Sequence, residues 1–120
     1  MSKVAMTVLV KGLANDLSST NIKAATLWPA TGIISAATNR IKNSLDPSID
    51  SKLRLPAIFA DAIVMMAKDP SLTCGATLID EDYLRSQGVT DFAQYRVDPE
   101  SEPPRMMPRE FPDLTVAEEN

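Results

Sequence analysis

The first part of the chain has a simple pattern of polar and apolar positions. Within residues 2–17 the polar side chains Lys3, Thr7, Lys11 and Asn15 fall four residues apart, and almost every other position is apolar. Side chains four apart lie on one side of an α-helix, so the pattern predicts a helix over 2–17 with one narrow polar stripe. A helix that is apolar around most of its girth is buried on more than one side. We therefore expect one side to cover a sheet and another to meet a second helix layer or a partner chain.

The segments that follow alternate between strand and helix patterns. Residues 21–28 form a short, mostly apolar run that ends at Pro29, which is typical of a buried strand. Pro56 suits the first turn of a helix, and Asp80 and Gly88 suit the start and end of a short one. We expect, in order, a strand over 21–28, a helix over 33–43, a loop over 44–52, a helix over 56–68, a strand over 74–80 and a helix over 81–88. The core side of the helix 56–68 should hold Ile58, Phe59, Ala62, Ile63, Met66 and Ala67.

This alternation predicts an α/β fold, with a parallel sheet and helices on its faces. Two strands are too few for such a sheet, because parallel strands occur in larger sheets that are covered on both faces. A chain of 120 residues is long enough for one domain at most. We therefore interpret residues 1–96 as the end of a longer α/β domain.

The charge is distributed unevenly. Residues 97–120 carry seven acidic side chains against two arginines, a net charge of −5, and five of the nine prolines. Such a composition predicts a disordered, solvated, acidic tail over 97–120.

Composition also restricts the chemistry. The chain has no histidine, which is the commonest general base and metal ligand, and its lone Cys74 cannot form an internal disulfide. The acids 80–82 are interpreted as helix caps, so no metal site is expected. A net charge of −4 gives no basic surface for nucleic acid, and no apolar run is long enough to span a membrane. With neither a signal peptide nor a peroxisomal ending in the sequence, we expect an intracellular location, by default the cytoplasm.

Several stretches resemble the short-chain dehydrogenase/reductase family. The stretch "SKVAMTVLVKGLANDLSSTNIKAATLWP" is similar to the part of these proteins that runs from the lysine of a Tyr-x-x-x-Lys motif, through a long helix, into the sixth strand. The segments "TLWP", "PAIFADA" and "IDE" resemble the hydroxysteroid dehydrogenase-like protein 2 group within that family. The resemblance covers about residues 2–98 and implies the C-terminal part of a Rossmann-like, doubly wound parallel sheet.

The resemblance also implies roles for particular residues. Lys3 matches the catalytic lysine, which binds the nicotinamide ribose and lowers the pKa of the tyrosine. Pro29 and Ala30 match the turn that lies against the nicotinamide, and Ile33 and Ser35 are the candidates for its backbone and hydroxyl contacts. The cofactor implied is NAD or NADP. The tyrosine would lie two residues before Met1, and the serine and the glycine-rich loop would precede it too, so this chain alone is expected to be inactive.

Three interpretations stay open at this point. The chain is either the C-terminal half of an NAD(P)-dependent oxidoreductase acting on a carbonyl or alcohol, or a non-catalytic interaction or dimerisation module derived from one. A partial gene product without activity of its own is the third possibility. In each case we expect self-association through the helix 2–17, because its apolar sides and the unpaired edge of the strand 21–28 need partners.

Overall fold

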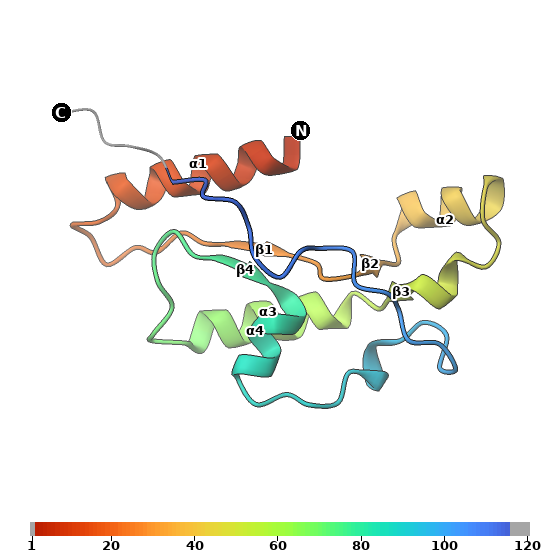
Figure 1. The fold of residues 1–120 in the computed structure, drawn as a ribbon. Coiled ribbons are helices and arrows are strands. Elements are labelled where there is room, and N and C mark those ends of the chain that lie inside the picture. Colours follow the sequence, from red (N-terminus) through yellow and green to blue (C-terminus); the bar gives the residue numbers. More distant parts are fainter. Residues whose placement is uncertain (1, 116–120) are drawn as a thin grey trace.

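The computed structural model describes residues 2–115, and its elements follow the predicted order (Figure 1). The helices are α1 (Ser2–Asp16), α2 (Ala36–Ser44), α3 (Ala57–Lys68) and α4 (Asp80–Ser86). The strands are β1 (Thr26–Trp28), β2 (Gly32–Ile33), β3 (Leu53–Arg54) and β4 (Thr77–Ile79), and short 3-10 turns span Ile49–Lys52 and Ala93–Tyr95. The predicted α/β class is confirmed.

Two small parallel sheets hold the chain together. In the first, β1 pairs with β4, with Leu27 opposite Leu78. In the second, β2 pairs with β3. The strands predicted over 21–28 and 74–80 are therefore present but shorter, and within residues 2–115 the other edges of β1 and β4 have no strand beside them. The pair β2–β3 was not predicted, because two-residue strands leave no periodicity to detect.

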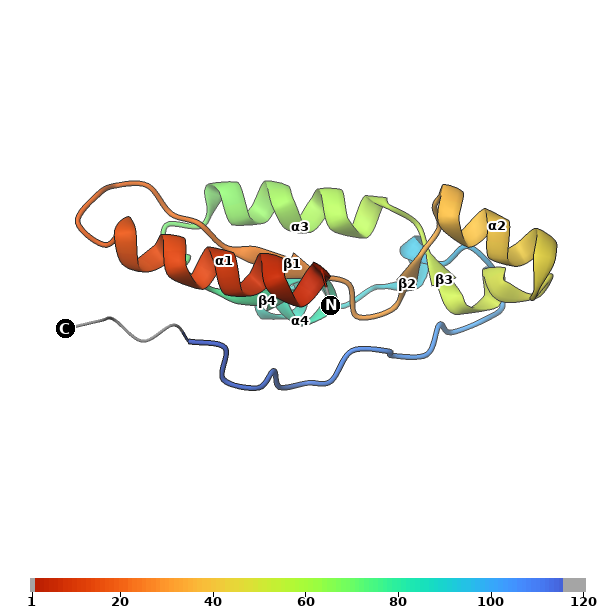
Figure 2. The ribbon, with the colours of Figure 1, turned by 90° about the horizontal axis from the view of Figure 1, so that it is seen from above.

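The first helix turns its polar stripe, and not its apolar side, toward the rest of the chain. Its buried residue is Thr7, whose hydroxyl accepts a hydrogen bond of 3.0 Å from the indole N–H of Trp28. One turn further on, Lys11 donates a hydrogen bond of 2.6 Å to the carbonyl of Gly75. The polar stripe therefore faces the rest of the chain, and α1 lies along one side of the first sheet with its apolar sides outward (Figure 2).

The core lies between α3, α4 and the turn that follows α4. Its buried members are Ile58, Ala62, Tyr83, Leu84, Phe92 and Tyr95. The core side predicted for α3 is confirmed for Ile58 and Ala62, whereas Ile63 and Ala67 are exposed. The radius of gyration is 16.2 Å, against about 14 Å expected for a compact domain of this length. The described chain is therefore open, with apolar surface left uncovered.

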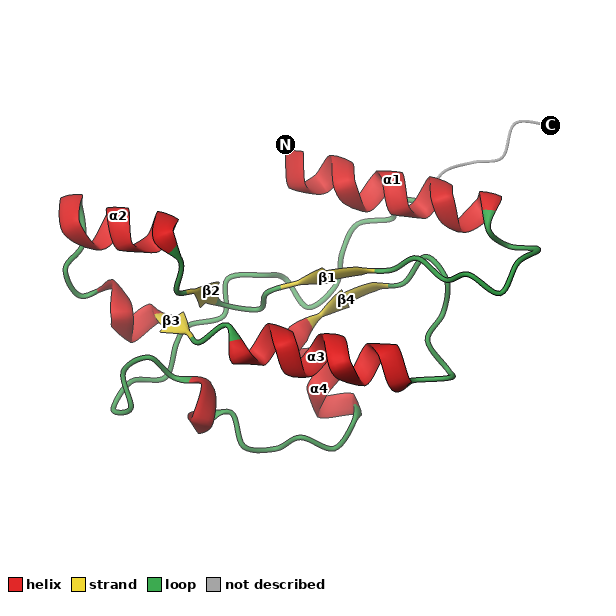
Figure 3. Ribbon diagram, turned by 180° about the vertical axis from the view of Figure 1, so that it is seen from behind, coloured by secondary structure: helices red, strands yellow, loops and turns green. Residues whose placement is uncertain are grey.

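The second helix stands apart from this core. The helix predicted from residue 33 begins at Ala36, because Ser35 forms a capping box in which its hydroxyl accepts from Thr38 N. No residue of α2 is buried, and the helix with the turn after it projects from one end of the molecule (Figure 3).

The C-terminal segment lacks regular structure but makes contacts with the body, and its predicted disorder stays a prediction. Residues 97–115 contain no helix or strand, yet they lie along the body, where Pro103 is buried and Glu102 pairs with Arg54 and Arg96. Two charged side chains of the segment, Glu102 and Arg105, meet opposite charges on the body, a feature that net composition does not reveal. Residues 116–120 of the predicted tail lie outside the part of the chain that the structure describes.

Candidate functional site

The turn after β1 is held from both sides by hydrogen bonds. Pro29 ends the strand, since it has no backbone N–H to continue the ladder. The backbone N–H of the fully buried Ala30 donates to Asp80 Oδ1 at 2.8 Å. Its carbonyl accepts from Met106 N at 2.8 Å and from Met107 N at 3.2 Å. Both polar groups of the Ala30 backbone are thus satisfied within the chain.

The same turn ends at a glycine that lies close to β3. A Cβ atom built on Gly32 would lie 2.7 Å from Leu53 Cδ2, closer than side chains approach without rearrangement. Gly32 therefore packs closely against the Leu53 side chain of β3, and the turn 29–32 joins the two sheets.

Asp80 is the electrostatic centre of this turn. Its side chain is 1% exposed and accepts from two backbone N–H groups, those of Ala30 and Glu81. Burial raises the pKa of the Asp80 carboxyl, and the two hydrogen bonds together with the charge of Arg54 oppose that rise. The carboxyl joins the start of α4 to the end of β1.

A cavity of about 620 Å³ opens beside the turn, between α1, the edge of β1 and α3. Trp28 and Phe59 supply much of its apolar lining, and Met107 reaches it from the C-terminal segment. Lys3 lies on its wall at the start of α1, with Pro29 from the turn. The cavity is therefore an apolar space with one ammonium group beside it.

The residues that the sequence predicted fall into two sets. Lys3 and Pro29 line the same cavity, and Lys3 makes no hydrogen bond or ion pair within residues 2–115. Ala30, Ile33 and Ser35 do not line it: Ala30 is buried in the turn, Ile33 lies in β2, and the Ser35 hydroxyl caps α2. Their roles toward a cofactor remain predictions.

Sequence reasoning missed three contributors to this site. Asp80 was interpreted as a helix cap, and its second bond, to a backbone fifty residues earlier, leaves no trace in the sequence. Met107 and Arg105 lie in the segment that the composition marks as solvated. The repeated prolines and apolar residues of that segment were the available signal.

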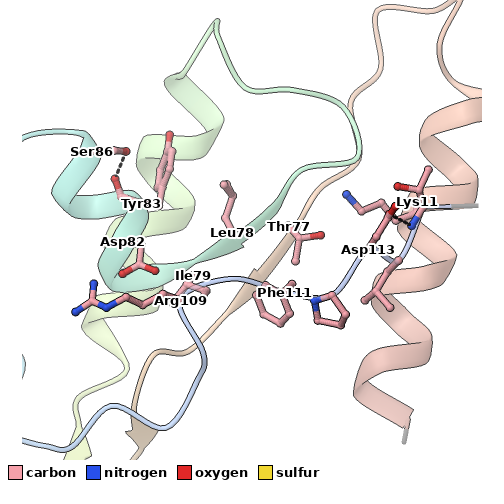
Figure 4. Close-up of a pocket in the computed structure, with 13 residues that line it drawn as sticks. Lys11, Thr77, Leu78, Ile79, Asp82, Tyr83, Ser86, Arg109, Phe111 and Asp113 are labelled. Carbon is pink, nitrogen blue, oxygen red and sulfur yellow. Dashed lines mark hydrogen bonds between the residues drawn. The ribbon is translucent and has the colours of Figure 1, made fainter.

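A second cavity, of about 520 Å³, lies between the C-terminal segment and the elements β4, α4 and α1 (Figure 4). Lys11 stands at one end and Arg109 at the other, with Phe111 between them. Among residues 2–115, no cluster of three or more His, Cys, Asp or Glu side chains is arranged to hold a metal ion. None of the helices in this described range is long and apolar enough to cross a membrane.

Comparisons of the sequence with curated proteins find one group of relatives. No family model matches the chain. Hydroxysteroid dehydrogenase-like protein 2 from Danio rerio is 33% identical over 99 residues, which cover 82% of this chain and 23% of the relative. The Homo sapiens protein of the same name is 31% identical over the same share. The chain thus spans about a quarter of the length of these curated relatives.

Solved structures give the same result in three dimensions. A short chain dehydrogenase from Mycobacterium thermoresistibile matches with a TM-score of 0.74 and 35% identity, over 88% of this chain and 37% of that one. A putative dehydrogenase from Xanthomonas campestris matches with a TM-score of 0.66 and 27% identity, over 38% of its length. More than four fifths of the chain is therefore homologous to part of the short-chain dehydrogenases, with hydroxysteroid dehydrogenase-like protein 2 among the relatives.

Proposed function

We propose that the chain supplies the nicotinamide-facing and substrate-facing part of an NAD(P)-dependent oxidoreductase, whose dinucleotide-binding part lies outside these 120 residues. The observation that carries the proposal is that Lys3 and Pro29 line one cavity beside the open edge of β1. The four glycines of the chain are scattered singly, so no glycine-rich phosphate loop lies within it. A dinucleotide-binding part would add its strands to β1 and close the cavity.

The lining of the cavity fits the nicotinamide end of such a cofactor. A flat ring suits the apolar wall formed by Trp28, Pro29 and Met107, and the unpaired ammonium of Lys3 can donate to ribose hydroxyls. The chemistry supplied by bound NAD(P)H is transfer of a hydride to a carbonyl carbon, with a proton going to the oxygen. Lys3 would hold its positive charge beside that proton donor and lower the donor's pKa.

Trp28 offers a direct test, because it is the one tryptophan of the chain and lines the cavity. The chain would be mixed with a tryptophan-free dinucleotide-binding part taken from a hydroxysteroid dehydrogenase-like protein 2. NADH added to the mixture should quench Trp28 emission by energy transfer, whereas the chain alone should show no saturable binding. Absence of quenching from a mixture that assembles would overturn the proposal.

Two lysine variants sharpen this experiment. Lys3→Ala should weaken NADH binding to the mixture, since it removes the donor from the cavity wall. Lys23→Ala is the matched control: its ammonium bonds to the carbonyl of Pro70, away from the cavity, and its loss should leave binding unchanged. Equal effects of the two variants would assign Lys3 no special role.

A second function, that of an interaction module, is favoured by the surface of α1. Leu9 and Leu13 lie on its outer side and Met6 at the border between that side and the cavity, and each of the three is at least 40% exposed. Apolar side chains grouped on one face of a helix mark a contact surface. This face would pair with a second copy of the chain or with a related dehydrogenase, whether or not the assembled protein is catalytic.

A further inference from the structure

The C-terminal segment contacts the candidate site. Residues 103–111, here called the strap, run along the side of the molecule away from α3, without helix or strand (Figure 2). The strap contacts the turn through the N–H groups of Met106 and Met107, which both donate hydrogen bonds to the Ala30 carbonyl. One end of the strap is anchored by the buried Pro103.

One arginine shapes the strap and fixes it to the body. Arg105 forms a two-pronged ion pair with Asp82 of α4, with both N–O distances at 2.8 Å. The same guanidinium donates from Nε to the carbonyl of Met107 at 2.8 Å and from Nη2 to that of Pro108 at 3.2 Å. Because a guanidinium is a rigid planar fork, these bonds fix the fold of 105–108 and its place on α4 together.

The arrangement brings two strap side chains to the site. Met107 lines the cavity that also holds Lys3 and Pro29. Phe111 packs on Trp28, with the ring centroids 5.6 Å apart and the planes inclined by 46°. Trp28 therefore contacts both the strap and Thr7 of α1.

We propose that the strap is a working part of this site, in which Arg105 is the positioning residue and Met107 the wall against which a nicotinamide or an apolar carbonyl substrate would pack. The ligand class rests on the proposed function, whereas the positioning by Arg105 does not. With the Arg105–Asp82 pair formed, Met107 stands in the cavity wall and the Pro29–Gly32 turn keeps its conformation. With the pair broken, the cavity opens and Trp28 becomes accessible.

The positioning is tested by acrylamide quenching of Trp28 in the whole chain. Arg105→Gln should increase quenching, because a partly exposed ion pair worth about 1 kcal/mol shifts the ratio of undocked to docked strap about fivefold. The exchanged pair Arg105→Asp with Asp82→Arg should restore part of the shielding, because it rebuilds the ion pair but not the bonds to the carbonyls of Met107 and Pro108. A merely destabilising change would restore none. Arg40→Gln, on the outer α2, should leave quenching unchanged. Unchanged quenching in Arg105→Gln, or failure of the exchange to restore shielding, would overturn the positioning role.

The ligand-facing role of Met107 needs the assembled protein. In the mixture with a dinucleotide-binding part, Met107→Asp should weaken NADH quenching of Trp28 or raise the KM for an apolar ketone, while the volume-conserving Met107→Leu should not. Equal behaviour of the two variants would overturn this role even where Arg105 behaves as proposed. If the unmodified mixture binds no NADH while the Arg105 variants still change acrylamide quenching, the proposed function fails and the positioning role stands.

Discussion

Replacement of Leu9 by lysine tests whether the outer face of α1 is a contact surface. This face is defined by Met6, Leu9 and Leu13, which are 57%, 63% and 40% exposed. Together they amount to about 1.6 fully exposed side chains, so their burial is worth roughly 2–5 kcal/mol in each copy. A two-fold symmetric dimer buries the face twice, for about 5–10 kcal/mol, against an association cost of roughly 4–15 kcal/mol.

The gain from burial and the cost of association overlap, so we expect a dimer whose population depends on the protein concentration. Leu9→Lys removes the most exposed of the three side chains from both copies, which should weaken the dimer by about 2–4 kcal/mol, more than tenfold in the dissociation constant. Lysine is nearly as good a helix former as leucine, so α1 itself should persist. Sedimentation over a range of concentrations would measure the mass of each variant.

The matched control is Leu45→Lys. Leu45 is 81% exposed at the end of α2, so the change adds the same charge and removes the same apolar group away from α1. It should leave the dimer intact. Dissociation by Leu45→Lys to the same extent, or an unmodified chain that stays a monodisperse 13.0 kDa species with one cooperative melt, would refute the reasoning.

Three further expectations concern single contacts. Asp80→Ala should destabilise the chain by about 2–4 kcal/mol in urea denaturation, because it leaves the buried N–H of Ala30 unpaired, while Asp80→Asn keeps the acceptor and should cost less than half as much. The hydrogen bonds from Arg105 hold the pKa of Asp82 below its ordinary value, so their stabilisation is complete above about pH 4 and is lost as the pH falls through the lowered pKa. Trp28 quenching should then rise in acid, and a flat titration there would count against the pair. Gly75→Ala should lower the free energy of unfolding by about 1–2 kcal/mol, and with it the melting temperature, because the φ of +86° at Gly75 is unfavourable for alanine. An unchanged melting temperature would argue against that conformation.

The elements that proline, glycine or an acidic residue delimits in the sequence were predictable. Pro56 precedes α3, and Gly88, with a φ of +95°, follows α4 in the left-handed conformation that ends helices. The strands of the first sheet were found because Pro29 and Asp80 delimit apolar runs. The second sheet was not, since β2 and β3 are too short to show an alternation. For the site, the family resemblance selected two residues that line the cavity, Lys3 and Pro29.

The contacts of the strap could not be read from the sequence for a different reason. They join main-chain atoms to main-chain atoms, as between Met106 and Ala30, or single charges far apart in the chain, as between Arg105 and Asp82. A composition average treats these charges as a net repulsion. In the structure Glu102 and Arg105 each meet an opposite charge, and these local pairs tie the segment to the body.

The orientation of α1 shows how a correct pattern can still leave the direction of packing open. The four-residue spacing located the polar stripe, but hydrophobicity alone would turn that stripe to solvent. The body instead offers the indole N–H of Trp28 and the carbonyl of Gly75, and these groups need polar partners when covered. Thr7 and Lys11 provide them, so the stripe faces inward and the apolar side is left outward. The same choice places Lys3 on the cavity wall, because it lies one turn before Thr7 on the inward stripe. Packing of the helix and placement of the candidate site lysine thus have one cause.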